Sequence, residues 1–240
     1  MKFGPNNFRL AGLRIVAASC IALLASATSH AGFVTTNEAG MDSIFSQVSF
    51  NGNTIDIRFG ATQTIFNTSL LDIDSAAELN FLASPTFGAS PTVRMFFVDS
   101  ISHCGGSGSF LGCAFQPGSV IALNSSSVAG GNGAKTMSHE LLHNLGLDHV
   151  LPDSGTNLMN PTVGSDVLTT PQADFIRGFG SGNAAGPLIQ SDGGGQRFIM
   201  ITPIAVLASP VPEPGTYGLM IAGLALLGVV SRRRKYGAVP

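Results

Sequence analysis

Three histidines and one glutamate near the middle of the chain are spaced for metal chemistry. Residues 139–149 read HELLHNLGLDH, which places His139, His143 and His149 four and then six positions apart. Side chains four residues apart lie one above the other on a helix, so the first two imidazoles can bind the same metal ion. Glu140 lies about 100° around such a helix from His139, where its carboxylate can reach a water beside the metal. The spacing therefore predicts a zinc site with Glu140 as general base.

A glycine explains how the third histidine can return to the metal. Gly146 follows the helical segment, and a residue without Cβ readily adopts the left-handed conformation that ends a helix and reverses the chain. The reversal brings His149 back as the third ligand. Three neutral nitrogens leave the fourth position of a tetrahedral Zn²⁺ open, whereas a structural site fills it with another protein ligand. We therefore predict one Zn²⁺ per domain, in a site of the catalytic type.

The pattern H-E-x-x-H-x-x-G-x-x-H resembles the signature of the metzincin clan of zinc metallopeptidases. Residues 157–161, Asn-Leu-Met-Asn-Pro, are similar to the methionine turn of that clan, with Met159 beneath the metal. Residues 168–179 resemble its C-terminal helix, with Pro171 in the first turn. The resemblance implies an α+β, zincin-like fold, in which a twisted and mostly parallel β-sheet is combined with an active-site helix and a small C-terminal helical subdomain.

The same resemblance implies a zinc metalloendopeptidase that hydrolyses peptide bonds of extracellular or matrix proteins. Glu140 would take a proton from water and pass it to the leaving amine. The substrate would lie extended along an edge strand near residues 118–124. No metzincin subfamily is assigned, because Val150 follows the third histidine and the only tyrosines, Tyr217 and Tyr236, lie in the C-terminal tail.

A protein of another class remains the alternative. The chain could be a non-catalytic matrix or adhesion protein that zinc stabilises. A structural zinc site does not require Glu140, so the presence of this carboxylate favours the enzyme.

The N-terminal residues 1–31 have the three-part form of a secretory signal peptide. Three basic residues precede the apolar run 15–24, and small residues follow, so signal peptidase is expected to cleave after Ala27 or Ala31. Ten strongly apolar residues are too few to cross a bilayer. Lipid attachment at Cys20 is disfavoured, because no Leu stands shortly before it and apolar sequence continues behind it. We expect the protein to be exported.

Residues 211–235 resemble the PEP-CTERM sorting signal of Gram-negative bacteria. The segment joins Pro-Glu-Pro at 212–214, an apolar stretch at 215–230 and a basic run at 232–235. The resemblance implies a short transmembrane helix as a transient anchor, processing by an exosortase-type enzyme, and a final location at the cell surface or in the extracellular matrix. A plain C-terminal membrane anchor is the alternative, because its topology would be the same.

Residues 32–210 form the expected metzincin-like catalytic domain, of which 197–210 are either the last part or a linker. The chain is 44% hydrophobic and can build a core. This region holds five basic and 13 acidic residues, a formal net charge of −8. Such a domain repels phosphate backbones, so nucleic acid is excluded as a partner.

The pattern of apolar residues predicts the elements that position the site. Spacing of three and four residues predicts helices over 37–47 and 69–82. Short apolar or alternating runs predict strands over 55–59, 92–98 and 119–123. The active-site helix then follows the last of these strands.

A Gly- and Ser-rich loop between the last two strands carries Cys104 and Cys113. Exported proteins meet an oxidising compartment, so we predict a disulfide between them. Zinc binding by the two thiols is the alternative, and it is disfavoured because the nearby His103 would supply only a third ligand.

Overall fold

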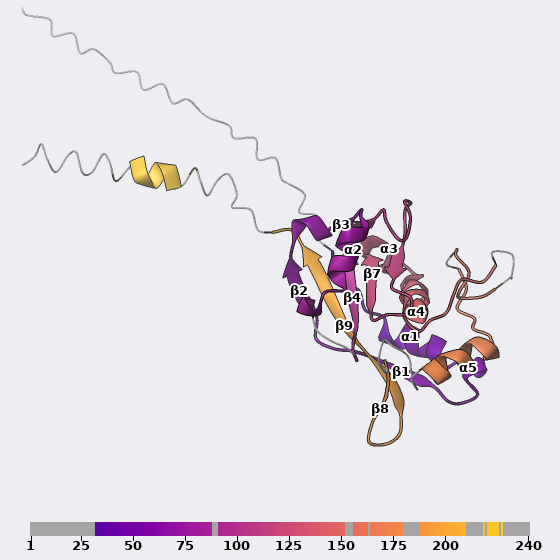
Figure 1. The fold of residues 1–240 in the computed structure, drawn as a ribbon. Helices are drawn as coiled ribbons and strands as arrows, with labels where there is room; N and C mark the ends of the chain where they lie inside the picture. The colour runs from indigo at the N-terminus through magenta and orange to yellow at the C-terminus, as the bar shows by residue number, and fades with distance from the viewer. Residues whose placement is uncertain are drawn as a thin grey trace, which may run out of the picture.

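The computed structural model describes residues 32–87, 91–151, 156–162, 164–179 and 188–209, together with 218, 220–225 and 227. The predicted signal peptide and most of the predicted sorting signal lie outside the described residues. The described domain combines one larger sheet with helices packed against it (Figure 1).

The elements follow one another in a mixed order of helices and strands. The helices are α1 (Glu38–Phe45), α2 (Ala76–Leu82), α3 (Ser125–Val128), α4 (Gly133–Asn144) and α5 (Thr170–Phe179), and the 3-10 turns are η1 (Val48–Phe50), η2 (Thr68–Leu70) and η3 (Pro85–Phe87). The strands are β1 (Ile55–Phe59), β2 (Gln63–Phe66), β3 (Asp72–Ile73), β4 (Val93–Val98), β5 (Ser100–Ile101), β6 (Gly112–Ala114), β7 (Val120–Asn124), β8 (Ile189–Ser191) and β9 (Arg197–Leu207).

The main sheet has the strand order β1-β9-β4-β7-β6, and β2 and β8 also pair with β9. β9 is parallel to β1, β2 and β4, and β4 is parallel to β7. Two short strands, β6 and β8, run antiparallel to their neighbours. The prediction of a mixed α and β fold with a mostly parallel sheet is therefore confirmed.

Strand β9 corrects the expectation that residues 197–210 could be a linker. Its 11 residues lie between β1 and β4 in the middle of the sheet. Ile199, Ile201 and Ile204 are fully buried. A strand that is hydrogen-bonded on both sides and buried in the core belongs to the folded unit, so the domain extends to the end of β9.

Two hydrophobic cores cover the two faces of the sheet. One contains residues of α1, α4 and α5, and the other contains residues of η2, β3 and α2. Alternate residues of β4 contribute to each: Met95 and Phe97 join the first core, and Phe96 and Val98 join the second. Burial on both faces explains why β4 is apolar at every position except Arg94.

Three predicted strands and the first helix are confirmed, whereas the second helix begins later than predicted. α2 starts at Ala76, because Ser75 caps it by accepting a hydrogen bond from the Glu78 N–H. The preceding residues form η2 and β3 instead. The first helix ends at Phe45, two residues earlier than predicted, and Val48 in the following η1 turn is 92% exposed.

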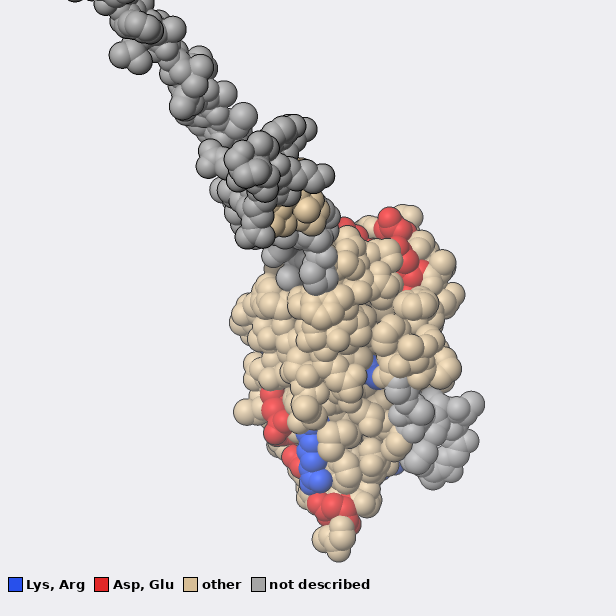
Figure 2. Space-filling model, turned by 90° about the vertical axis from the view of Figure 1, so that its left-hand side faces the viewer, with Lys and Arg blue, Asp and Glu red and all other residues tan. Residues whose placement is uncertain are grey.

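On the face of the domain that Figure 2 shows, most side chains are uncharged, and basic and acidic ones gather toward its lower end. In the C-terminal tail, residues 218, 220–225 and 227 are helical (Figure 1). No helix among the described residues has both the length and the hydropathy of a membrane span. Much of the predicted transmembrane helix over 215–230 lies outside the described residues.

Candidate metal centre

Helix α4 carries three of the four residues that the sequence predicted for the site. Every residue of α4 except Lys135 is buried, so the helix passes through the domain rather than over its surface. His139, Glu140 and His143 are 3%, 7% and 8% exposed. The metal-binding spacing therefore lies on a helix that the surrounding core holds in place.

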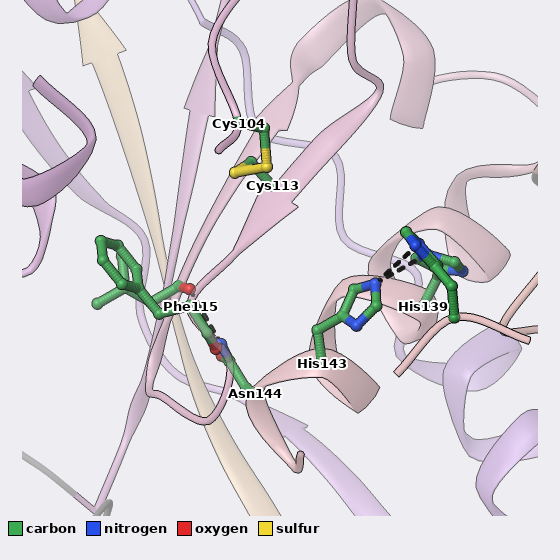
Figure 3. The surroundings of a disulfide bond; sticks show 8 residues. Cys104, Cys113, Phe115, His139, His143 and Asn144 are labelled. Carbon is green, nitrogen blue, oxygen red and sulfur yellow. Dashed lines mark hydrogen bonds between the residues drawn. A yellow bond between two sulfur atoms is a disulfide. The ribbon is translucent and has the colours of Figure 1, made fainter. Parts of the chain in front are cut away.

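The three predicted ligands converge on one point. The Nε2 atoms of His139, His143 and His149 lie 3.1 Å from one another in all three pairs. Figure 3 shows the rings of His139 and His143 turned toward each other. Nitrogens bound to one tetrahedral zinc at about 2.0–2.1 Å are about 3.3 Å apart, so the cluster fits a metal ion with little adjustment. The three histidines can hold a metal.

Main-chain carbonyls orient two of the rings. The Nδ1–H of His139 donates to the Leu158 carbonyl at 2.7 Å, and that of His143 donates to the Leu147 carbonyl at the same distance. A proton on Nδ1 leaves the lone pair on Nε2, which is the atom that faces the other rings. Such partners fix the tautomer and the orientation of metal-binding histidines.

Burial keeps the imidazoles in their neutral form. It is the main reason why the pKa of His139 falls to about 4, and the nearby His143 and His149 act in the same direction against the hydrogen bond to Leu158. Burial also lowers the pKa of His143 and of His149. A neutral imidazole is the form that binds a metal ion, so the donors suit the site.

Gly146 ends α4 as the sequence predicted. Its φ is +89°, in the left-handed region. The Gly146 N–H donates to the His143 carbonyl and the Leu147 N–H donates to the Leu142 carbonyl, which together form a Schellman motif. The turn thus reverses the chain toward His149 and also brings the Leu147 carbonyl to His143.

The predicted methionine turn contacts both segments that carry histidines. Met159 is fully buried, and its carbonyl accepts a hydrogen bond from the Val150 N–H, next to His149. Leu158 in the same turn binds His139. The Asn157 side chain accepts from the Met159 N–H at 2.8 Å, which closes the turn.

Helix α5 supports this turn through a pair of amides that the sequence analysis missed. Asn157 donates to Gln172 at 2.9 Å, and Gln172 donates back to Asn157 at 3.2 Å. Gln172 also accepts from the Thr169 N–H at the start of α5. These residues lie 15 positions apart, so no local pattern could have joined them.

Glu140 lies in a cavity of about 570 Å³ together with the three histidines. Burial raises the pKa of its carboxyl to about 8. The Glu140 side chain fits against β6 only because Gly112 has no side chain there. A Cβ at Gly112 would lie 2.6 Å from Cγ of Glu140. The carboxyl group is thus packed directly against the main chain of a strand.

The edge of the sheet differs from the prediction. β7, at residues 120–124, pairs with β4 on one side and with β6 on the other, so it is an interior strand. The edge strand beside the site is β6, which the sequence analysis had left in a loop. Its three residues are too few to show a strand period in the sequence. Gly112 and Ala114 of this edge strand line the cavity.

Asn144, which the sequence analysis also missed, joins the active-site helix to this edge. Its Nδ2 donates to the Phe115 carbonyl at 2.8 Å and to the Val120 carbonyl at 3.0 Å. Figure 3 shows the amide reaching the Phe115 carbonyl. The Gly118 N–H donates to the Asn144 carbonyl in return. The connection between β6 and β7 is thereby held against the end of α4.

The predicted disulfide between Cys104 and Cys113 is present, with an S–S distance of 2.01 Å. It rules out the alternative in which the two thiols bind zinc, because both sulfurs are joined to each other. Cys104 lines the cavity and Cys113 lies in β6 (Figure 3). The disulfide therefore holds the loop before β6 against the edge strand beside the site.

Comparison with known proteins bears on the C-terminal tail. The PEP-CTERM protein-sorting motif matches residues 210–235. The motif indicates an exported protein sorted to the cell envelope of Gram-negative bacteria, and it implies processing by an exosortase-type enzyme. No curated protein and no solved structure matches the chain.

Proposed function

We propose that the exported domain is a zinc metalloendopeptidase of the metzincin type, which cleaves proteins at the cell surface or in the extracellular matrix. One observation carries the proposal: three histidine nitrogens 3.1 Å apart open into the same cavity as a buried glutamate. A purely structural metal site needs neither the glutamate nor the cavity.

The proposed metal is zinc, held by His139, His143 and His149. Three imidazoles are a ligand set that zinc enzymes use, and they leave one coordination position open. When bound, Zn²⁺ supplies Lewis acidity, which activates a water and polarises the carbonyl of the scissile peptide bond.

Glu140 is the proposed general base. In its ionised form Glu140 accepts the proton that the attacking water loses and delivers it to the amine that leaves. Its neighbour in sequence, His139, is a ligand, so helix geometry keeps the carboxylate beside the metal site. Packing against Gly112 restricts its movement.

The open edge of β6 is the proposed binding site for the substrate main chain. The Asn124 N–H donates to the Leu111 carbonyl, and the Phe115 N–H donates to the Val120 carbonyl. Hydrogen-bonding direction alternates along a strand, so the main-chain groups of Gly112 and Ala114 point away from β7, toward the open edge. An extended peptide can add to this edge as a further strand.

The fold supports a zincin-like assignment in its main features. A mostly parallel sheet, an antiparallel edge strand, a buried helix with two of the ligands, and a turn with the buried Met159 that Gln172 of α5 supports occur together. The central position of β9 adds a C-terminal strand that the resemblance did not predict.

Substitution of Glu140 by Gln tests the proposal. The change keeps the size of the side chain and removes the group that accepts the proton. Turnover of an unstructured protein substrate should fall about 10⁴-fold, with zinc content unchanged. The measurement compares wild type and Glu140→Gln at equal zinc occupancy, with a chelator as the second arm.

Two results would contradict the proposal. Equal activity in both proteins would remove Glu140 from the mechanism. Absence of chelator-sensitive cleavage in wild type, across a broad peptide library, would favour the non-catalytic matrix or adhesion protein.

A further inference from the structure

The cavity beside the histidines has an unbalanced set of charged side chains. Glu140 and Asp148 line it, and none of its described lining residues is Lys or Arg. The lining also includes the apolar residues Phe110 and Leu111. Asp148 is therefore the lining residue whose carboxylate can face a substrate cation without a basic side chain beside it.

The basic residues of the described domain are engaged elsewhere. Arg58 pairs with Asp56 and Asp192. The other basic side chains donate hydrogen bonds to main-chain carbonyls. The partners are Ala83 and Ser84 for Arg94, Gly164 for Lys135, Phe50 for Arg177, and Arg177 for Arg197. These contacts hold the cations away from the cavity, so they do not neutralise its carboxylates.

Asp148 is held at a defined place on the cavity wall. Its Oδ1 accepts a hydrogen bond of 2.7 Å from Nε2 of Gln116, which also lines the cavity. Gln116 follows β6 by two residues, and Asp148 directly precedes His149. The carboxylate is thus joined to the segment that follows the edge strand, and it belongs to the residue before a candidate metal ligand. Asp148 is exposed, so a substrate side chain can reach it.

We infer that Asp148 is a specificity residue that selects substrates with a Lys or Arg side chain close to the scissile bond. The inference rests on the proposed peptidase function and names the substrate class of the same cavity. A carboxylate that already accepts one hydrogen bond still has lone pairs for a cationic side chain. The net charge of −8 of residues 32–210 acts in the same direction, because it attracts basic proteins and repels acidic ones.

A different role for Asp148 is support of the metal site, because its charge also acts on His143 and His149. The two roles differ in what they predict. Support of the metal would affect all substrates alike and would change zinc content. Selection of cations would change only the ratio between basic and neutral substrates.

The experiment measures peptide binding separately from cleavage. The zinc-loaded Glu140→Gln protein is titrated into fluorescein-labelled decapeptides that differ at one position, which carries Lys, Gln or Glu within three residues of a fixed central dipeptide. Binding is followed by fluorescence anisotropy at low and high salt. Asp148→Asn is compared in the same background with Asp166→Asn, a matched loss of one exposed carboxylate that does not line the cavity.

The Lys peptides should bind about fivefold more tightly than the Gln peptides, and the preference should weaken at high salt. The ratio between the affinities for the Lys and Gln peptides should fall to about one in Asp148→Asn and stay unchanged in Asp166→Asn. Asp148→Lys, a second variant, should reverse the preference toward the Glu peptides.

An unchanged Lys preference in Asp148→Asn, or no preference in any protein, would overturn the inference. Loss of zinc with equal weakening of all peptides would also overturn it and assign Asp148 to the metal site. Failure of the proposed function would give a different result: wild type would not cleave any peptide, but the preference for Lys peptides in binding would remain. Cleavage without a charge preference would refute the specificity of Asp148 alone.

Discussion

At the scale of single residues, hydrogen bonds and burial hold two histidines of the candidate site in position. Hydrogen bonds to Leu158 and Leu147 hold the rings of His139 and His143, and burial keeps both rings neutral. Preorganised ligands lose little conformational freedom when a metal binds. Each imidazole offers one ligand atom to the same point, so the affinity for zinc should depend on all three.

Replacement of His143 by Ala should remove stoichiometric zinc from the protein. Loss of an outer-shell partner already weakens metal sites about 10- to 100-fold, and loss of a ligand should weaken this one by about 100-fold or more. Metal analysis of the purified protein measures the effect. His103→Ala is the matched control, because His103 is not part of the cluster. Full zinc occupancy in His143→Ala would show that the ligand set is wrong.

At the scale of elements, the relation between α4 and the edge strand decides the shape of the site. β6 has three residues and is paired on one side only, so little of its own sequence holds it in place. Two tertiary connections do so: the disulfide from Cys104 to Cys113 and the amide of Asn144. Because Asn144 directly follows His143, the helix end that carries a ligand is also the point to which the strand is attached.

Asn144→Ala should lower the free energy of unfolding by about 1–3 kcal/mol. The substitution removes the side-chain donor from the Phe115 carbonyl and one of the two donors from the Val120 carbonyl, which keeps the Phe115 N–H, and loss of a partner costs a buried polar group about 1–3 kcal/mol. Urea unfolding of the disulfide-bonded protein measures it. The exposed Asn53, replaced by Ala, should change the stability by less than about 0.5 kcal/mol. Equal stability of the two variants would mean that Asn144 does not hold the edge strand.

At the scale of the whole molecule, the two ends of the described domain lie together. The Gly32 N–H donates to the Val206 carbonyl at the end of β9, and the Ser209 N–H donates to Thr68. A Cβ at Gly32 would lie 1.9 Å from the Phe97 carbonyl, so only glycine fits there. The sorting motif at residues 210–235 begins directly after Ser209. The fold is thus complete before the motif starts.

Deletion of residues 210–235 should therefore release a folded protein that is no longer sorted to the envelope. The expected result is its appearance in soluble fractions, with the zinc content of wild type, because the three candidate ligands lie within residues 139–149 and β9 ends at Leu207. Cell fractionation with immunoblotting measures the location. Deletion of residues 236–240, which follow the motif, is the control and should leave sorting unchanged. Unaltered sorting without residues 210–235 would show that the motif does not act here.

Much of the site could be predicted from the sequence because its parts are close together along the chain. The ligands and Glu140 lie within 11 residues, and helix geometry relates the first three of these residues directly. The role of Gly146 at the end of the helix could be predicted from local steric reasoning, and its φ of +89° agrees with that prediction. The pairing of Cys104 with Cys113 followed from the redox compartment and from the absence of other cysteines after residue 31.

Only the tertiary structure decided which strand forms the edge and which residues hold the site together. β9 lies about 140 residues after β1 in the chain, and its place between β1 and β4 depends on long-range burial that no local pattern contains. Asn144, Gln172 and Gln116 have polar side chains whose partners lie 15 to 32 positions away. The local periodicity of a sequence predicts elements, whereas contacts between elements arise when the whole core is packed, so these residues became visible only in the fold.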